Sequence, residues 1–172
     1  VFGKRHADTL RSMNDLGELA APTLYNGVLY VINPKWTFAI DVETGHQIWR
    51  TPVRLEEGRS WPNCNCARGA ATIYDGKLFR TTLDNHLVAL DMTTGRELWN
   101  QRFADHRDGY YASSAPIVAN GVVISGISGG DRPTRGFLDG WDPETGEKLW
   151  RRYTVPAPGE PGAETWPVDS DA

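Results

Sequence analysis

The sequence predicts an all-β protein made of repeated four-stranded antiparallel units, and three observations support this fold class. The element Asp-x-x-Thr-Gly-x-x-x-Trp begins at residues 41, 91 and 142, so it recurs about every 50 residues. Each copy follows an apolar segment interrupted by Asn-Gly or Asp-Gly, the dipeptides favoured in β-hairpin turns. Seven Trp and 18 Gly are typical of a turn-rich protein packed with aromatic side chains. Repeats of this length, with about four short strands each, are typical of β-propeller blades.

The first repeat shows how the sequence specifies each strand. Residues 21–32, A-P-T-L-Y-N-G-V-L-Y-V-I, read as a strand, an Asn-Gly turn and a second strand. We expect a third strand at Thr37–Ile40, a tight turn at Asp41–Gly45 and a fourth strand that ends at Trp49. In the turn, Asp accepts backbone N–H bonds and Gly adopts a positive φ. The Trp that follows at a constant offset is expected to pack between neighbouring blades.

Two further copies of this pattern follow, in residues 71–99 and 115–150. Known propellers need at least four blades, so three repeats do not close a ring. We therefore expect the chain to be one part of a larger ring that another chain or a further segment completes. The expected repeats, and a Pro- and Gly-rich linker towards a further blade, are residues 18–50, 68–100, 113–151 and 152–172.

The composition argues against several classes of protein. With 172 residues, 40% of them apolar, the chain is long enough for one domain, and no run approaches the 18 apolar residues of a membrane-spanning helix. The net charge is −4 and Lys and Arg do not cluster, which argues against nucleic acid as a partner. The two cysteines, Cys64 and Cys66, form neither a disulfide scaffold nor half of a zinc site, because no second Cys or His pair has ligand spacing. The first residues lack the apolar core of an intact signal peptide.

Three irregular segments interrupt the repeats, and we expect the functional site there. Polar residues at 56–65 and 103–113 precede the first strands of the second and third repeats. In propellers such insertions emerge on one face near the central channel, where ligands bind. A Ser-Gly-Gly-Asp corner at residues 128–131 interrupts the third repeat after its second strand.

These segments resemble one known family. The repeated element is similar to the tryptophan-docking motif of the quinoprotein alcohol dehydrogenases, which are eight-bladed propellers. Three segments make the resemblance more specific: C-x-C-A-R-G-A-A at 64–71, the stretch from Ser113 to Gly136, and the Pro- and Gly-rich loop at 153–167. The resemblance runs from about Glu18 onward and matches only the first part of a family member of typical length.

The resemblance implies an activity. The family binds pyrroloquinoline quinone (PQQ) with Ca²⁺ or a lanthanide ion on the propeller axis, and oxidises an alcohol, polyol or sugar hydroxyl by hydride transfer to the quinone. Cytochrome c or a quinone is the implied electron acceptor, and the periplasm is the implied location. The family's aspartate base, its Asn metal ligand and the Trp below the cofactor lie in later blades, and no position here matches them. This chain is therefore expected to supply one wall of the site and no catalytic residue.

The resemblance also assigns residues to the cofactor. Arg68 matches the arginine that clamps a PQQ carboxylate, and Ser113 and Ser128 match two hydroxyl positions at the cofactor's acid edge. Glu18 matches a glutamate near the cofactor, although its spacing to Pro22 is one residue too long. The alternatives are an exposed arginine at a strand start and serines that bond their own backbone.

The corner and the cysteines complete the predicted site. Gly129 and Gly130 permit close backbone approach, and their N–H groups form an anion-binding nest. Asp131 takes the place of the family's metal-binding Glu but is one methylene shorter, so a surface turn is its alternative role. Many relatives have adjacent cysteines joined as a ring over the quinone. Here Asn65 separates the two cysteines, 64 and 66, so a disulfide and two thiols both remain open. A disulfide would imply an oxidising compartment.

A second function class also fits the repeats. Propellers that act as binding or assembly modules, without redox chemistry, share the docking element. The C-x-C-A-R-G and Ser-Gly-Gly-Asp segments distinguish the two classes, because an assembly propeller has no need of them.

Overall fold

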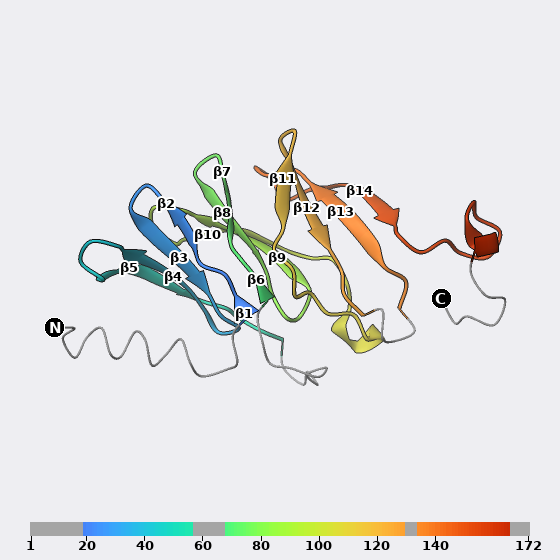
Figure 1. The fold of residues 1–172 in the computed structure, drawn as a ribbon, viewed down its shortest axis with the longest axis horizontal. Helices are drawn as coiled ribbons and strands as arrows, with labels where there is room; N and C mark the ends of the chain where they lie inside the picture. Colours follow the sequence, from blue (N-terminus) through green and yellow to red (C-terminus); the bar gives the residue numbers. More distant parts are fainter. Residues whose placement is uncertain (1–18, 57–67, 130–133, 166–172) are drawn as a thin grey trace.

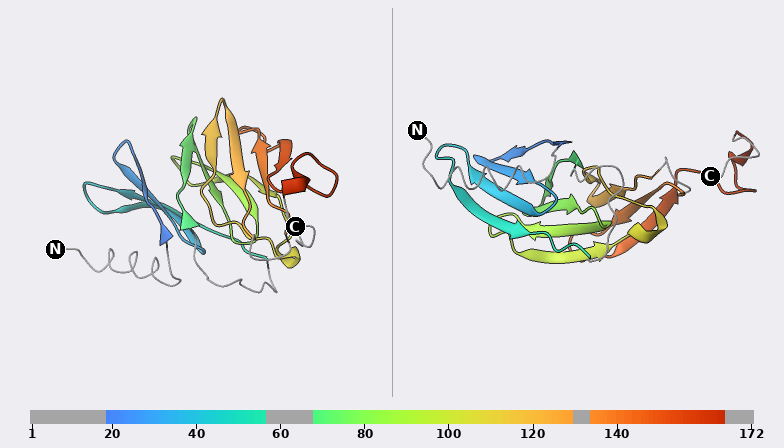
Figure 2. Two further views of the ribbon diagram at one scale, coloured as in Figure 1. Left: turned by 45° about the vertical axis from the view of Figure 1, so that its right-hand side comes forward. Right: turned by 90° about the horizontal axis from the view of Figure 1, so that it is seen from below.

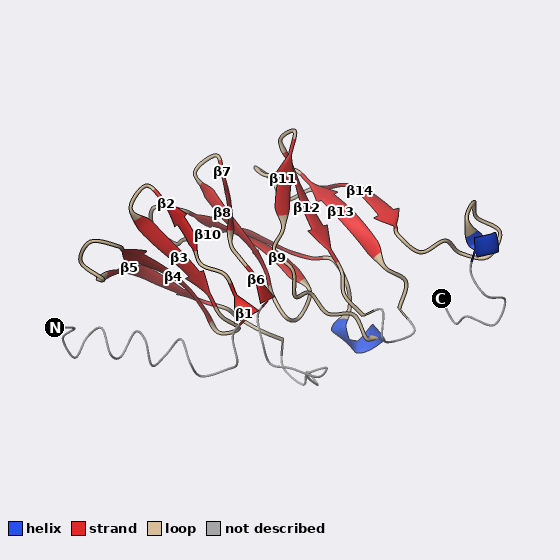
Figure 3. Ribbon diagram, in the orientation of Figure 1, coloured by secondary structure: helices blue, strands red, loops and turns tan. Residues whose placement is uncertain are grey.

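Three four-stranded antiparallel sheets lie side by side in the computed structural model (Figure 1), which describes residues 19–56, 68–129 and 134–165. Viewed from below, the sheets follow a curve, with the first strand of each sheet on the concave side (Figure 2). Apart from the strands, the described residues form turns, loops and two short 3₁₀ helices (Figure 3), and they contain no helix long and apolar enough to cross a membrane. The all-β prediction with three four-stranded blades is confirmed.

Each blade is a meander in which consecutive strands pair with each other. Two additional two-residue strands, β1 and β6, pair in parallel before the first strands of blades 1 and 2. The 3₁₀ helices η1 and η2 follow blades 2 and 3. The bounds are β1 Leu19–Ala20, β2 Thr23–Tyr25, β3 Val28–Ile32, β4 Trp36–Asp41, β5 Gln47–Pro52, β6 Arg68–Gly69, β7 Thr72–Tyr74, β8 Lys77–Thr81, β9 His86–Asp91, β10 Glu97–Arg102, η1 His106–Asp108, β11 Ile117–Ala119, β12 Val122–Gly126, β13 Phe137–Trp141, β14 Lys148–Tyr153 and η2 Ala163–Thr165.

The turns have the chemistry that the sequence predicts. Asn26 and Gly27, between β2 and β3, have φ of 46° and 74°, the left-handed pair that a type I′ hairpin turn requires. In the repeated element, the carboxylate of Asp41 accepts hydrogen bonds from the backbone N–H (2.8 Å) and hydroxyl (2.7 Å) of Thr44. These bonds hold the pKa of Asp41 below its ordinary value. Gly45 closes the turn with φ of 69°.

The tryptophans join successive blades, as predicted. Trp49 of blade 1 donates its indole N–H to the carbonyl of Met92 in blade 2 (3.2 Å), and Trp99 donates to Pro143 in blade 3 (3.1 Å). Each ring covers the glycine of the next blade's turn, Gly95 or Gly146, so closely that an added Cβ would approach it within 2.6 Å or 2.7 Å. The repeated element therefore serves both as the turn of its own blade and as the docking surface for the preceding tryptophan.

A buried arginine also links blades 1 and 2. Arg80, on β8, is 2% exposed and donates at 2.9 Å to the carbonyls of Asn33 and Trp36 and to the hydroxyl of Thr37. Burial lowers the pKa of Arg80 to about 10, because the charged form loses its hydration. The guanidinium thus donates to two backbone carbonyls of blade 1 at the junction of the two sheets, where the Trp36 carbonyl also accepts the Asn33 N–H at 2.9 Å.

Candidate functional site

Two of the predicted site residues lie where the chain enters the first strand of a blade. Arg68 and Ser113 stand four residues before Thr72 and Ile117, the first residues of β7 and β11. Leu19 stands at the equivalent position before β2, and its backbone pairs in register with that of Arg68. Figure 1 places β1, β6 and η1 at the same end of the blades. The repeat therefore presents one equivalent position per blade at this end of the concave side.

The structure brings the two predicted hydroxyls together. The Oγ atoms of Ser113 and Ser128 lie 3.1 Å apart, although 15 residues separate them in sequence. The Ser128 N–H donates to the carbonyl of Tyr111 at 2.9 Å, and the Tyr111 N–H donates back at 3.3 Å. Both serines are half-buried. This two-bond bridge fixes the end of β12 against the segment that enters β11.

The hydroxyl pair fits an anionic ligand. Each serine hydroxyl carries one proton, and a mutual hydrogen bond uses only one of the two. The remaining O–H can donate to an acceptor such as a carboxylate, and hydrogen bonds to a charged acceptor are the stronger kind. The pair therefore has the chemistry expected at the acid edge of PQQ, a flat tricarboxylate.

Gly129 is required by the protein's own packing. Its φ is 133°, and a Cβ added there would lie 2.6 Å from the hydroxyl oxygen of Thr134 and 3.3 Å from the carbonyl oxygen of Gly109. The Thr134 hydroxyl donates to the Gly129 carbonyl at 2.7 Å. A side chain at residue 129 would therefore displace the Thr134 hydroxyl or the Gly109 carbonyl from the backbone that follows Ser128.

Several predicted residues remain predictions. Glu18, Cys64, Cys66, Gly130 and Asp131 lie outside the described residues, and Arg68 is placed only by its backbone. Within the described ranges, no group of three or more His, Cys, Asp or Glu side chains is arranged to hold a metal ion.

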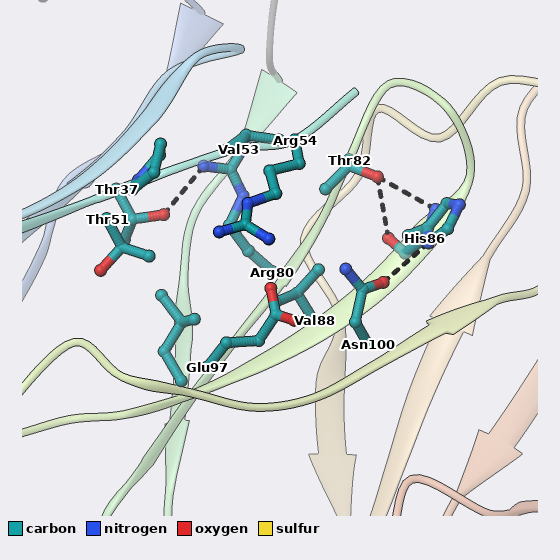
Figure 4. Close-up of a pocket in the computed structure, with 12 residues that line it drawn as sticks. Thr37, Thr51, Val53, Arg54, Arg80, Thr82, His86, Val88, Glu97 and Asn100 are labelled. Carbon is teal, nitrogen blue, oxygen red and sulfur yellow. Dashed lines mark hydrogen bonds between the residues drawn. The ribbon is translucent and has the colours of Figure 1, made fainter. Parts of the chain in front are cut away.

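A small cavity lies between blades 1 and 2, away from the predicted cofactor residues. Its volume is about 20 Å³, roughly enough for one water molecule, and none of the predicted site residues lines it. Figure 4 shows His86 beside Thr82 and Asn100 in its wall. The imidazole Nδ1 of His86 lies 2.7 Å from Oδ1 of Asn100. This cavity is too small for a tricyclic cofactor.

Sequence reasoning missed a cluster of ionisable side chains around η1. Glu56, His86, Arg102 and His106 converge from the connection after blade 1, strand β9, strand β10 and η1. Nothing in the sequence joins these residues, because 16 or more positions separate most of them. Their contacts depend on how blade 2 packs between its neighbours.

The curved row of three four-stranded antiparallel sheets identifies the chain as a segment of a β-propeller. The family model described as "PQQ: Glucose/ethanol/alcohol dehydrogenase, beta-propeller domain" matches residues 4–172. The chain therefore belongs to this family, as its resemblance predicted.

Known proteins agree with this assignment. Quinoprotein alcohol dehydrogenase PedH of Pseudomonas putida is 37% identical over 140 residues, which cover 81% of this chain and 23% of that protein. The structure of a europium-containing methanol dehydrogenase matches with a TM-score of 0.72 and 27% identity, covering 84% of this chain and 26% of that chain. This chain thus spans about a quarter of the length of these dehydrogenases.

A protein that is not named as a dehydrogenase shares the same fold. The crystal structure of BamB from Moraxella catarrhalis matches with a TM-score of 0.60 and 24% identity, over 83% of this chain and 40% of that chain. At this identity the likeness concerns the arrangement of the blades alone.

Proposed function

We propose that this chain forms one wall of the cofactor site in a PQQ-dependent dehydrogenase. The whole protein would oxidise an alcohol, polyol or sugar hydroxyl by hydride transfer to the quinone. The observation that carries this proposal is the convergence of Ser113 and Ser128, with their Oγ atoms 3.1 Å apart, beside the tightly packed Gly129. Membership of the PQQ propeller family supports it independently.

When bound, PQQ supplies the quinone that accepts the hydride. The role of this chain is to bind and orient that group. The Ser113–Ser128 pair would donate its remaining O–H to a cofactor carboxylate, and Arg68 would pair with a carboxylate through its planar guanidinium. Glu18 stands near the cofactor, Gly129 and Gly130 offer backbone N–H groups, and the catalytic base comes from outside this chain.

A metal ion and the cysteine segment complete the proposed site. Asp131 offers the hard oxygen donor that Ca²⁺ or a lanthanide prefers. One structural relative is named as containing europium, which favours testing both kinds of ion. Cys64 and Cys66 form part of the cofactor wall, and a disulfide between them would be stable in the periplasm, the location we propose.

Partners follow from the length of the chain and from the proposed reaction. The remainder of the propeller, either a further segment or another chain, packs on blade 3 and supplies the base. Reduced cofactor must pass its electrons on, for which we propose cytochrome c or a quinone.

Titration of the full-length protein with PQQ tests the proposal. We would follow quinone absorbance in the presence of Ca²⁺ and, separately, of a lanthanide. The double variant Ser113→Ala/Ser128→Ala should bind roughly 10- to 100-fold more weakly, because hydrogen bonds to a charged group contribute about 1.5–3 kcal/mol. The exposed neighbour Ser114, changed to Ala, is the matched control. Equal affinity of the double variant and the control would refute this role of the serines.

The alternative is a binding or assembly propeller without a cofactor. The observation that supports this alternative is the fold shared with BamB. Failure of the full-length protein to bind PQQ with either kind of ion would favour this alternative and overturn the proposed dehydrogenase.

A further inference from the structure

Glu56 connects the end of blade 1 with blade 2. It follows β5 by four residues, and its backbone N–H donates to the Asp84 carboxylate at 2.8 Å. Asp84 is 1% exposed and also accepts a hydrogen bond from the Thr82 hydroxyl at 2.6 Å. The backbone of Glu56 is therefore fixed to the turn between β8 and β9.

The carboxylate of Glu56 faces four nitrogen-bearing side chains, of which Arg107 is the most distant, with its Nη2 3.9 Å from Oε2. Its Oε1 lies 3.4 Å from Nη1 of Arg102 and 3.7 Å from Nε2 of His86, while its Oε2 lies 3.6 Å from Nδ1 of His106. The His106 side chain is 6% exposed. Among the described residues, the buried Nε2 of His86 and Nδ1 of His106 have no hydrogen-bond partner. Without the Glu56 carboxylate, the only acid left beside either nitrogen in the described part of the chain would be Asp105, whose Oδ1 lies 3.9 Å from Nδ1 of His106.

The same side chains order the loop that contains η1. Arg102 pairs with Asp105 at 2.6 Å, and Asp105 caps η1 by accepting the Arg107 N–H at 2.9 Å. Gly109 ends η1 with φ of 89°. Glu56 thus holds this loop through Arg102 at its start and His106 within η1.

The loop then reaches the predicted cofactor corner. The carbonyl of Gly109 packs against Gly129, at 3.3 Å from the position of an added Cβ. Two residues further on, Tyr111 forms the two-bond backbone bridge with Ser128. A continuous set of contacts therefore runs from Glu56 through η1 to Ser128 and Gly129.

We propose that Glu56 is a positioning residue for Ser128 and Gly129. Its carboxylate holds the loop at residues 102–111, and the loop sets the place of the Ser128 hydroxyl beside Ser113. Glu56 acts through the loop, since its described contacts are with Asp84, His86, Arg102, His106 and Arg107. The consequence for PQQ affinity rests on the proposed function, whereas the order of the corner does not.

Amide hydrogen exchange in the cofactor-depleted full-length protein tests the positioning. Glu56→Gln, which keeps the size of the side chain but removes its charge, should raise exchange at Tyr111 and Ser128 about fivefold, the order expected for losing partly buried ion pairs. Glu56→Asp keeps the charge and should restore part of the protection. Glu43→Gln, the same change at an exposed residue of blade 1, is the control and should leave these rates unchanged.

PQQ titration of the same variants gives the second readout. Glu56→Gln should raise the dissociation constant about threefold to fivefold, with Glu43→Gln at the wild-type value. Unchanged exchange at Tyr111 and Ser128 in Glu56→Gln would overturn the positioning role. An equal rise in the amides of β3, in blade 1, would also overturn it, because the effect would then be global. If the wild type binds no PQQ, the proposed function fails, while the exchange rates still decide the role of Glu56.

Discussion

The docking of each tryptophan on the next blade predicts that Gly146→Ala is more damaging than an alanine at another left-handed glycine. Gly146 has φ of 71°, and a Cβ there would lie 2.7 Å from Cδ2 and 2.9 Å from Cε3 of Trp99. Forcing an L-residue into this conformation costs roughly 1–2 kcal/mol. Displacing the indole ring adds the cost of overpacking, about 1–3 kcal/mol. We therefore expect Gly146→Ala to lower the free energy of unfolding by about 2–5 kcal/mol.

Gly76 provides a matched control for the backbone cost. Its φ is also 71°, but no heavy atom lies within 4 Å of an added Cβ. Gly76→Ala should therefore cost only the conformational part, roughly 1–2 kcal/mol. Urea denaturation of the full-length protein, followed by tryptophan fluorescence, would measure both variants.

A double-mutant cycle isolates the contact itself. In a Trp99→Ala background the ring is absent, so Gly146→Ala should cost no more than Gly76→Ala does in the wild type. The reasoning is refuted if Gly146→Ala and Gly76→Ala are equally destabilising in the wild type. It is also refuted if removing the Trp99 ring does not reduce the cost of Gly146→Ala.

Two further predictions concern the buried arginine and the repeated turn. Arg80→Met removes the donors for two carbonyls and one hydroxyl of blade 1. It should lower the free energy of unfolding by about 2–4 kcal/mol in urea denaturation. An unchanged free energy of unfolding would mean that the cost of burying the guanidinium cancels the stabilisation from its hydrogen bonds. Hydrogen bonds from Thr94 hold the pKa of Asp91 below its ordinary value. Its turn therefore contributes stability that is present above about pH 4 and is lost as the pH falls through the folded-state pKa. Asp91→Asn should lack this part of the pH dependence in denaturation curves recorded from about pH 5 down to about pH 2, and an identical pH profile would contradict the assignment.

The sequence predicted the blades well because their determinants are local and repeated. The Asp-to-Trp element specifies a tight turn through bonds within five residues, and its fixed offset places Trp49 and Trp99 on the next blade. The alternation of apolar and polar residues along β8 did not predict the burial of Arg80, because a charged residue within a strand is normally expected to face solvent. Its partners lie 43 to 47 residues away in blade 1, so only the packing of the two sheets creates its environment.

The candidate site residues that lie in family motifs could be assigned from the sequence, whereas residues brought together only by packing could not. The family resemblance assigned Ser113 and Ser128 to the same edge of the cofactor, and in the structure their hydroxyl oxygens lie 3.1 Å apart. Their role in cofactor binding stays a prediction. The same resemblance gave Gly129 a role in close approach to a ligand, whereas the structure shows that Thr134 and Gly109 also require it. Glu56 belongs to no motif, because its partners come from β9, β10 and η1 rather than from its own repeat.

The repeat itself explains how one scaffold can carry the chemically varied residues of the proposed site. The position four residues before the first strand is Leu19 in blade 1, Arg68 in blade 2 and Ser113 in blade 3, and the register of β1 with β6 shows that the first two are equivalent in space. The turns and tryptophans that hold the blades together lie elsewhere in each repeat. Side chains at this one position can therefore be apolar, cationic or hydroxylic without changing the docking of the blades. A binding site for a large, flat anion requires such variety, because its wall must combine apolar surface with donors to carboxylates.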